Sequence, residues 1–507
     1  MLVTVFDCLA LLRNEGLVLS HMLNQAETSE ITGLSFDNRT IKQGEVFVCK
    51  GTAFRMQYLD LAIQAGASVY LSETVWKDDF PYIQVSDIRL AMAALAKAFY
   101  GEDAQSLRKI GITGTKGKST VASFLNAILD DYHQAICGVP TALISSILVY
   151  DGTVKEDAKL TTPEAMDLWR YLANAGKNGL DYAVCEVSSQ ALKYHRTKGV
   201  DFDVAVFLNI GEDHISDMEH SDFNDYFSSK LSIFQSSKVA VINSSSDHFD
   251  EVVLAAQDAG CEIVTFGFLP TDTLYCTGFS HRENGAAFEA KWKEDVLLSY
   301  EISLSGSYNV ENALAALAVS KVFDVPYCYA KSGLLSAVAK GRGVRLSTRD
   351  KKITVIVDYA HNKMSMNALF SYATEAFPGQ KIVSVFGAPG QKAKNRRADM
   401  GQAAAAFCDH VIITEDDPAG EELADICQEI ADTVAKSGTP YDIVYQREDA
   451  IQKAFLLLED GGVLLLCGKG AETSQKRKKG AEPYEGDEFF ARKEIEIYDK
   501  NKMMVSL

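Results

Sequence analysis

The sequence lacks several features that would point to other classes of protein. It has ten cysteines but no Cys-x-x-Cys pair, so neither a zinc site nor a disulfide framework is predicted. No apolar run is long enough to cross a bilayer, and the apolar start lacks the basic residues and cleavage site of a signal peptide. There is also no internal repeat and no low-complexity linker. Together these absences favour reduced thiols and a cytoplasmic location.

Positive charge is scarce as well. Lysine and arginine number 50 against 69 aspartates and glutamates, and the formal net charge is -19. This balance argues against a general nucleic-acid or membrane surface, although a few local cations could still bind an anionic small molecule. The 507 residues exceed what one hydrophobic core usually supports, so two to four domains are expected.

The most informative stretch is Gly111-Ile-Thr-Gly-Thr-Lys-Gly-Lys-Ser-Thr120. An apolar strand is predicted before it, over 107–112, and apolar residues at helical spacing predict a helix after it. In this arrangement the turn's N–H groups and the helix N-terminus bind phosphate, Lys118 reaches the terminal phosphates and Ser119 binds Mg²⁺. Ile112 stands where the common spacing has glycine, so an ordinary strand–helix turn is the alternative. Gly-Lys-Ser on the right elements favours ATP.

Three units are predicted along the chain, with boundaries at 1–105, 106–340 and 341–507. The first has short strands over 46–49, 68–71 and 82–85 and helices over 58–65 and 90–100. The second and third alternate strands with helices, which predicts two doubly wound, mostly parallel α/β sheets beside a smaller α/β domain. The strands are expected over 182–185, 204–209 and 239–243, and then over 353–357, 382–386, 410–414 and 463–467.

Polar residues cluster where these strands end, which is where parallel sheets bind ligands. Ser119, Glu186 and His214 would meet at one such edge and could hold a divalent cation, although a lone Glu or His after a strand is usually structural. Lys230, on a predicted helix, is by default a surface lysine. The 35–39 turn could hold a ligand or be a solvated loop, and the basic segment 475–480 is expected to be a solvated loop.

Two sheets with polar strand ends favour a reaction cleft between domains. ATP bound to one sheet would activate a first substrate and the far domain would capture a second. Such chemistry joins a carboxylate to an amine through an acyl phosphate.

The ordered set of clusters resembles the Mur ligases, the ATP-dependent amide-forming enzymes of peptidoglycan precursor synthesis, and most closely their tripeptide synthetases. Each motif is weak alone, but the set is specific and covers nearly the whole chain. The motifs are Thr113-Gly-Thr-Lys-Gly-Lys-Ser-Thr120, Leu160-Thr-Thr-Pro-Glu164, Glu186-Val-Ser-Ser-Gln-Ala191, Asn209 with Asp213-His214, Asn309-Val-Glu-Asn312, Asp358-Tyr-Ala-His-Asn362 and Gly468-Lys-Gly470.

The resemblance implies a UDP-sugar-binding domain (1–105), a central ATP-binding domain (106–340) and a C-terminal, Rossmann-like amino-acid-binding domain (341–507). It implies that the enzyme uses ATP and Mg²⁺ to add a diamino acid to UDP-MurNAc-L-Ala-D-Glu, giving ADP and phosphate. A monomer is the default expectation. The γ-carboxylate of D-Glu takes the γ-phosphoryl group, and the incoming amine attacks the acyl phosphate. Phosphoryl transfer of this kind depends on positioning of the reactants and on charge neutralisation.

The same resemblance assigns the site residues. Catalysis and metal binding fall to Lys118, Ser119, Glu186, His214 and Lys230, the last as a carbamate that supports a second Mg²⁺. ATP is expected to contact Gly114, Thr115, Lys116, Gly117, Lys118, Ser119, Thr120, Asn309, Arg342, Asp358 and His361. The UDP-dipeptide is expected to contact Ser35, Asp37, Arg39, Thr161, Thr162, Ser189 and Arg196.

The incoming amino acid is expected to meet Arg397, Asp416, Asp417 and Glu472. Diaminopimelate enzymes of the family usually carry Asp-Asn-Pro-Arg where this chain has Asp416-Asp-Pro-Ala419. Alanine cannot pair with a second carboxylate, and the two aspartates suit an ε-ammonium, so L-lysine is favoured over meso-diaminopimelate, with ornithine open.

Two departures from the family pattern, at 340–344 and at Lys363, border the hinge between the second and third units. They leave room for an ATP-binding homologue that has lost ligation. A folylpolyglutamate synthetase and a ligase that adds to a different muramyl peptide are further alternatives. The Thr-Thr-Pro stretch and the 1–105 unit argue against the folate enzyme.

Overall fold

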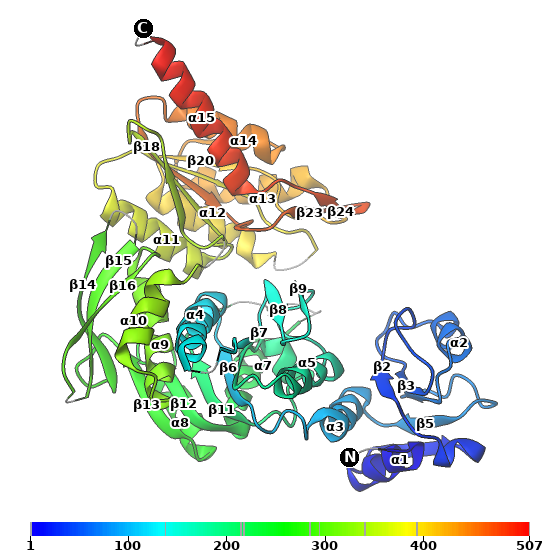
Figure 1. Ribbon diagram of the computed structural model, residues 1–507. Coiled ribbons are helices and arrows are strands. Elements are labelled where there is room, and N and C mark those ends of the chain that lie inside the picture. Colours follow the sequence, from blue (N-terminus) through cyan, green and yellow to red (C-terminus); the bar gives the residue numbers. More distant parts are fainter. Residues whose placement is uncertain are drawn as a thin grey trace.

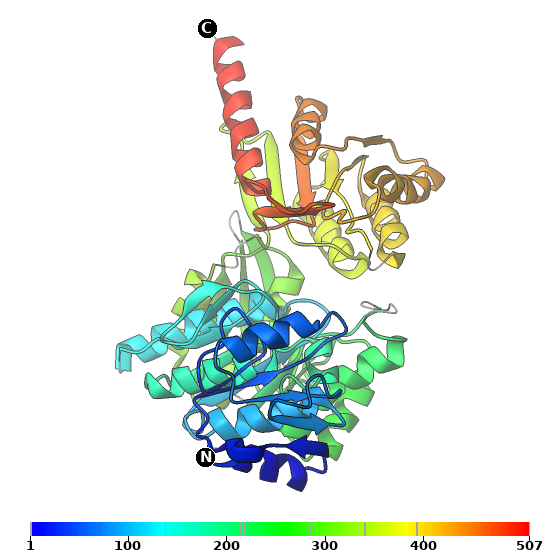
Figure 2. The ribbon, with the colours of Figure 1, turned by 90° about the vertical axis from the view of Figure 1, so that its right-hand side faces the viewer.

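The computed structural model describes residues 3–136, 138–212, 215, 219–282, 285–293, 295–338, 341–391 and 394–505. These residues form three units that follow one another along the chain (Figure 1). The C-terminal unit stands above the central unit in both views, and its last helix projects away from the other two (Figure 2). Within the described ranges, no helix is both long and apolar enough to span a bilayer.

The N-terminal unit is built on a five-stranded sheet of order β1-β5-β4-β3-β2, parallel except for the β1–β5 pair. A capping box between Thr4 and Asp7 begins its first helix, and Asp87 caps the helix that leads to the central unit. The elements are α1 (Val5–Asn14), β1 (Val18–Met22), β2 (Gly33–Ser35), β3 (Glu45–Val48), α2 (Met56–Gln64), β4 (Val69–Ser72), β5 (Tyr82–Val85) and α3 (Ile88–Tyr100).

The central unit has an eleven-stranded sheet of order β16-β15-β14-β13-β12-β11-β6-β10-β7-β8-β9. Pairing is parallel from β14 to β7 and antiparallel in the hairpins at both ends. Its first half contains β6 (Arg108–Thr113), α4 (Lys118–Ile136), β7 (Ala142–Ile144), β8 (Leu148–Tyr150), β9 (Lys155–Asp157), α5 (Ala165–Lys177), β10 (Tyr182–Glu186), α6 (Ser189–Lys193) and β11 (Phe202–Phe207).

The second half of the central unit completes this sheet. It contains α7 (Phe223–Leu231), β12 (Ser237–Asn243), α8 (Phe249–Asp258), β13 (Glu262–Gly267), β14 (Leu274–Arg282), β15 (Gly285–Trp292), β16 (Leu298–Ile302), α9 (Ser307–Val322) and α10 (Tyr327–Ser336). Strands β6 and β11 lie at its centre and are almost wholly buried, as expected for parallel strands covered on both faces.

The C-terminal unit is a second wound sheet of order β17-β18-β22-β19-β20-β21, in which only the β17–β18 pair is antiparallel. Separate hydrophobic clusters pack on its two faces. Its elements are β17 (Val344–Ser347), β18 (Ile353–Asp358), α11 (Lys363–Ala376), β19 (Ile382–Phe386), α12 (Asn395–Phe407), β20 (His410–Ile413), α13 (Leu423–Lys436), β21 (Tyr441–Ile443), α14 (Arg447–Leu457), β22 (Gly462–Cys467), β23 (Ser474–Arg477), β24 (Gly480–Pro483) and α15 (Asp487–Val505).

The basic segment 475–480 differs from its prediction. It belongs to the β23–β24 hairpin and is not a solvated loop. The guanidinium of Arg477 binds both carboxylate oxygens of Glu415 at 2.8 and 3.0 Å and reaches Glu482 at 2.8 Å. Glu415, from a distant loop, and Glu482, on the facing strand of the hairpin, therefore hold Arg477 in place.

Candidate active site

The phosphate loop joins β6 to α4, and a neighbouring strand fixes its shape. Asn209, just after β11, accepts from the Lys116 backbone N–H at 2.8 Å and donates to the Lys116 carbonyl at 3.2 Å. Gly117 has φ +89°, and a Cβ there would come within 2.4 Å of the Asn312 side chain. The positive φ and this close approach favour glycine at the position. They also show that α9 packs directly against the loop.

Two lysines place their ammonium groups on the same loop carbonyl. Lys118 donates to the Gly114 carbonyl at 2.8 Å, and Lys230 donates to it at 3.0 Å. Lys230 lies 4.7 Å from the centre of the Tyr226 ring and is 2% exposed. The default expectation of a surface lysine is therefore wrong, because α7 turns this residue inward against the loop.

A carboxylate closes the other side of the loop. Glu186, at the end of β10, is 1% exposed. Its carboxylate accepts from the Ser119 hydroxyl at 3.1 Å and from the Ser146 backbone N–H at 2.9 Å. The two serine hydroxyls are 2.9 Å apart. Ser146 was missed in the sequence because it follows a three-residue strand that has no distinctive pattern.

These oxygens suit a magnesium ion. Mg²⁺ usually takes one or two protein oxygens and completes its shell with water and substrate phosphates, and Ser119 and Glu186 supply such a pair beside the phosphate loop. His214, the third predicted ligand, lies outside the described residues. Among the residues that are described, no group of three or more His, Cys, Asp or Glu side chains could hold a metal without it.

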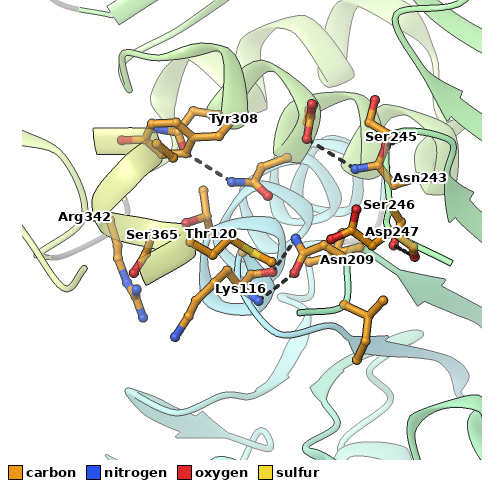
Figure 3. A pocket seen from close by; sticks show the side chains of 18 of the residues that line it. Lys116, Thr120, Asn209, Asn243, Ser245, Ser246, Asp247, Tyr308, Arg342 and Ser365 are labelled. Atoms are coloured by element: carbon orange, nitrogen blue, oxygen red, sulfur yellow. Dashed lines mark hydrogen bonds between the residues drawn. The ribbon is translucent and has the colours of Figure 1, made fainter. Parts of the chain in front are cut away.

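A cavity of about 300 Å³ adjoins the loop and is lined from both the central and the C-terminal units. Figure 3 shows Lys116 and Arg342 on one side of it, and Asn243 and Asp247 on the other. The cationic side adjoins the phosphate loop and suits the phosphates of a nucleotide, whereas the polar far side suits its base or ribose. Four more predicted ATP residues also line the cavity: Gly117, Thr120, Asn309 and Asp358.

The C-terminal unit reaches this cavity through the segment after β18. His361 places Nε2 3.1 Å from the Lys116 ammonium, while its Nδ1 lies 2.7 Å from the Tyr359 carbonyl. Asp358 accepts from the backbone N–H groups of Gly343 and Ala360 at 2.7 and 2.8 Å, and burial raises the pKa of its carboxyl. Predicted nucleotide residues from two units thus meet at one place.

The two departures from the family pattern, at Lys363 and at 340–344, lie in different parts of the structure. Lys363 begins α11 and donates to Gln402 at 3.0 Å, away from the cavity lining. Lys340 lies outside the described residues.

The residues predicted for the UDP-dipeptide occupy the junction of the N-terminal and central units. Thr162 donates to the Glu186 carbonyl at 2.9 Å, and Arg196 donates to the Thr162 carbonyl at 3.1 Å. Ser189 lies 3.0 Å from Nε2 of His220, and Thr161 is half-buried beside Thr162. This set therefore lies next to the Glu186 backbone.

The 35–39 turn follows β2 and holds itself together. Arg39 binds the Asp37 carboxylate through Nε at 2.9 Å and Nη2 at 2.6 Å, and this pair lowers the pKa of Asp37. Ser35 donates to the Asp37 carbonyl at 3.2 Å. The Arg39 side chain is 81% exposed, so the turn presents its ion pair to solvent.

An acidic cluster lies at the strand ends of the C-terminal unit. The Lys469 ammonium is fully buried and binds Asp417 at 2.9 Å and Glu472 at 2.7 Å. Tyr359 also donates to Glu472, at 3.1 Å. Burial raises the pKa of Asp416 to about 6, and this carboxylate receives no hydrogen bond from the described residues. The cluster thus has three carboxylates around one lysine.

Arg397 is placed differently from the other predicted amino-acid residues. Its side chain is 1% exposed, and its two Nη groups bind Glu421 at 2.8 and 2.9 Å and Glu429 at 2.9 Å. The structure therefore gives Arg397 two protein carboxylates as partners, and a substrate carboxylate would have to share the guanidinium with them. Neither partner was predicted, since both lie more than twenty residues away in sequence.

A phosphate loop between a strand of a parallel sheet and a helix, a cavity lined from two wound units and a separate acidic cluster together define an ATP-dependent α/β enzyme with places for further substrates. Comparisons with known proteins agree. The profile of the Mur ligase middle domain matches residues 112–320, and that of the Mur ligase, glutamate ligase domain matches residues 341–470.

Relatives match over almost the whole chain. It is 36% identical to the UDP-N-acetylmuramoyl-L-alanyl-D-glutamate--L-lysine ligase of Enterococcus faecalis, over 96% of this chain and 94% of that protein. It is 36% identical to the ligase of the same name from Streptococcus pyogenes, over 90% of this chain and 91% of that protein. A solved UDP-N-acetylmuramoyl-L-alanyl-D-glutamate--2,6-diaminopimelate ligase is 25% identical, with a TM-score of 0.61, over 93% of this chain and 96% of that one.

The chain belongs to the Mur ligase family. The predictions of the family, of the three-unit α/β fold and of an ATP-dependent ligase are confirmed.

Proposed function

We propose that this ligase uses ATP to join a diamino acid, L-lysine in preference, to the γ-carboxylate of D-Glu in UDP-MurNAc-L-Ala-D-Glu, forming ADP and phosphate. The observation that carries the choice of lysine is the acidic cluster of the C-terminal unit. Among the described residues, Asp416, Asp417 and Glu472 lie around Lys469, and the other cation that acts on Asp416, Arg447, is already paired with Asp487. The cluster therefore favours a ligand with a further positive charge.

Ala419 supports the same choice. It follows the two aspartates and offers no cation for a second substrate carboxylate, so a side chain ending in an amine fits better than one ending in an amino acid. The names of the two relatives from Enterococcus faecalis and Streptococcus pyogenes specify L-lysine, in agreement with this reading of the pocket. Diaminopimelate and ornithine are the alternatives that a direct comparison must exclude.

Phosphoryl transfer would take place at the loop between β6 and α4. Lys118 rests on the Gly114 carbonyl and would move to the γ-phosphate when ATP binds, while Lys116 and Arg342 flank the nucleotide cavity. Mg²⁺, held by Ser119 and Glu186 when bound, would neutralise phosphate charge. Positioning and charge are what such a transfer requires.

Amide formation would follow on the far side of the same cleft. The γ-carboxylate of D-Glu attacks the γ-phosphorus, and ADP leaves with the electrons of the broken bond. The amine then attacks the acyl carbon, inorganic phosphate leaves, and the amine loses a proton. Glu472 and Asp416 would hold the ammonium groups of the amino acid in place.

The test is a phosphate-release assay with the full chain, ATP, Mg²⁺, UDP-MurNAc-L-Ala-D-Glu and L-lysine, with the product identified by mass. Release that requires all the substrates and yields the tripeptide nucleotide supports the proposal. ATP hydrolysis that proceeds equally without the nucleotide sugar and the amino acid would instead favour a switch that has lost ligation. A monomeric state and a cytoplasmic location stay predictions.

A further inference from the structure

A cluster of basic side chains lies at the junction of the N-terminal and central units, around one carboxylate. Lys50, just after β3, places its ammonium 3.2 Å from Glu164 Oε1, and Arg196 places Nη2 3.1 Å from the same oxygen. Arg89, on α3, stacks on Tyr194 with its guanidinium carbon 4.2 Å from the ring centre. These three cations and Glu164 are called the junction cluster below.

The junction cluster has more positive charge than its surroundings neutralise. Burial lowers the pKa of Lys50, and the charges of Arg89 and Arg196 lower it further, against the opposing effect of Glu164. Burial followed by the Arg89 charge likewise lowers the pKa of Arg196. Like charges held together in a partly dehydrated place are unfavourable unless an anion joins them.

Two donors of the cluster also have no acceptor. Arg89 Nη1 and Arg196 Nε are buried, and no group among the described residues accepts a hydrogen bond from either. A buried donor of a charged group is costly to leave without an acceptor. Two such donors on adjacent guanidinium groups indicate a missing ligand with anionic oxygens.

The cluster lies between two parts of the proposed substrate site. On one side the Lys50 ammonium is 4.7 Å from the ring of Phe36, within the 35–39 turn. On the other, Arg196 donates to the Thr162 carbonyl and Thr162 donates to the Glu186 carbonyl. A ligand that extends from the turn to Glu186 would therefore pass the three cations.

We infer that Lys50 and Arg89 join Arg196 as positioning residues for anionic oxygens in the middle of the nucleotide-sugar peptide, with Glu164 as their counter-ion when the ligand is absent. The inference rests on the proposed function. Because cations from the N-terminal unit and from the central unit share one anion, ligand binding also ties the two units together. These oxygens belong either to the diphosphate or to the α-carboxylate of D-Glu.

Calorimetric titration of the full chain without ATP tests the inference and separates the two sources. The probes are UDP-MurNAc-L-Ala-D-Glu, UDP-MurNAc, which has the diphosphate but no peptide, and 1-O-methyl-MurNAc-L-Ala-D-Glu, which has the peptide but no diphosphate. Lys50→Met keeps the apolar stem over Phe36 but removes the charge. Lys77→Met removes a half-buried lysine that pairs with Asp60 in the same unit and is the matched control.

Loss of one charge-assisted contact should weaken binding of the complete ligand about tenfold in Lys50→Met and in Arg89→Met. Lys50→Arg should stay near wild type, and Lys77→Met should be unchanged. If these variants also bind UDP-MurNAc more weakly, the anionic oxygens belong to the diphosphate. If they bind 1-O-methyl-MurNAc-L-Ala-D-Glu more weakly, the oxygens belong to the D-Glu carboxylate. In turnover, KM for the nucleotide sugar should rise while KM for ATP stays constant, a split that general loss of structure would not produce.

Unchanged affinity for the complete ligand in both Lys50→Met and Arg89→Met would overturn the inference and leave the proposed function intact. Failure of the wild-type chain to bind UDP-MurNAc-L-Ala-D-Glu at all would refute the proposed function itself. The two failures are therefore distinguishable in one series of titrations.

Discussion

Replacement of Lys230 by alanine tests the least ordinary feature of the ATP site. The ammonium of Lys230 shares the Gly114 carbonyl with that of Lys118 in a buried place, at 3.0 and 2.8 Å. Two like charges on one acceptor repel each other, whereas a carbamate on Lys230 would turn one of them into an anion. That anion could attract Lys118 and support a metal, as the family resemblance implies.

The expected loss of activity in Lys230→Ala follows from the buried surroundings of the Lys230 side chain. Removing one preorganised charge costs about 3 kcal/mol or more, so turnover should fall by at least about two orders of magnitude. Truncation also removes three buried methylene groups, at about 0.8 kcal/mol each. A loss of about 2 kcal/mol leaves a protein of ordinary stability folded. Inactivity of Lys230→Ala would therefore report chemistry and not unfolding.

Phosphate release by Lys230→Ala, measured with and without added formate or acetate, tests whether Lys230 acts as a carbamate. The small anion should restore part of the activity because the truncation leaves space for it. Lys230→Met fills that space and should be inactive without rescue, and Lys238→Ala, whose side chain is 74% exposed, should behave as wild type. Near-normal turnover of Lys230→Ala would refute the reasoning, and the absence of rescue would leave carbamylation unsupported.

Three further predictions concern other parts of the site and fold. Lys118→Met should lower kcat by two orders of magnitude or more in the phosphate-release assay, since a preorganised charge is lost from the γ-phosphate; activity within a few-fold of wild type would exclude that role. Burial raises the pKa of Asp416 to about 6, so its negative charge is lost as the pH falls through 6. KM for the amino acid should therefore rise below that pH and stay constant between pH 7 and 8. Asp416→Asn should abolish this pH dependence. Arg447→Met breaks a fully buried bidentate ion pair with Asp487, whose two contacts are both 2.7 Å. The free energy of unfolding of the C-terminal unit, measured with denaturant, should fall by about 3–5 kcal/mol. A fall of less than about 1 kcal/mol would show that the pair contributes little.

Strongly local signals in the sequence predicted much of the fold. The strands 82–85 and 382–386 appear in the structure with the expected bounds, because short apolar runs identify them without tertiary information. The hairpin strands β14 to β16 and the β23–β24 hairpin were not predicted. The strands β14 and β23 are half-exposed segments that carry no long buried run, so nothing local distinguishes them from loops.

The site was predicted less completely, for a related reason. Residues within a motif, such as Asn309 and Asp358, line the nucleotide cavity as expected. The burial of Lys230, the carboxylate partners of Arg397 and the contact of Ser146 with Glu186 depend on segments far apart in sequence. Long-range packing decides each of them, and a single sequence does not show it.

The choice of amino acid tests the central claim most directly. The measurement is kcat/KM for L-lysine, L-ornithine and meso-diaminopimelate, with saturating ATP and UDP-MurNAc-L-Ala-D-Glu and phosphate release as the signal. Because the acidic cluster offers Asp416, Asp417 and Ala419 where a second carboxylate would need a cation, lysine should be used at least about a hundredfold more efficiently than diaminopimelate. This ratio corresponds to about 3 kcal/mol of discrimination. Faster addition of diaminopimelate than of lysine would contradict the account.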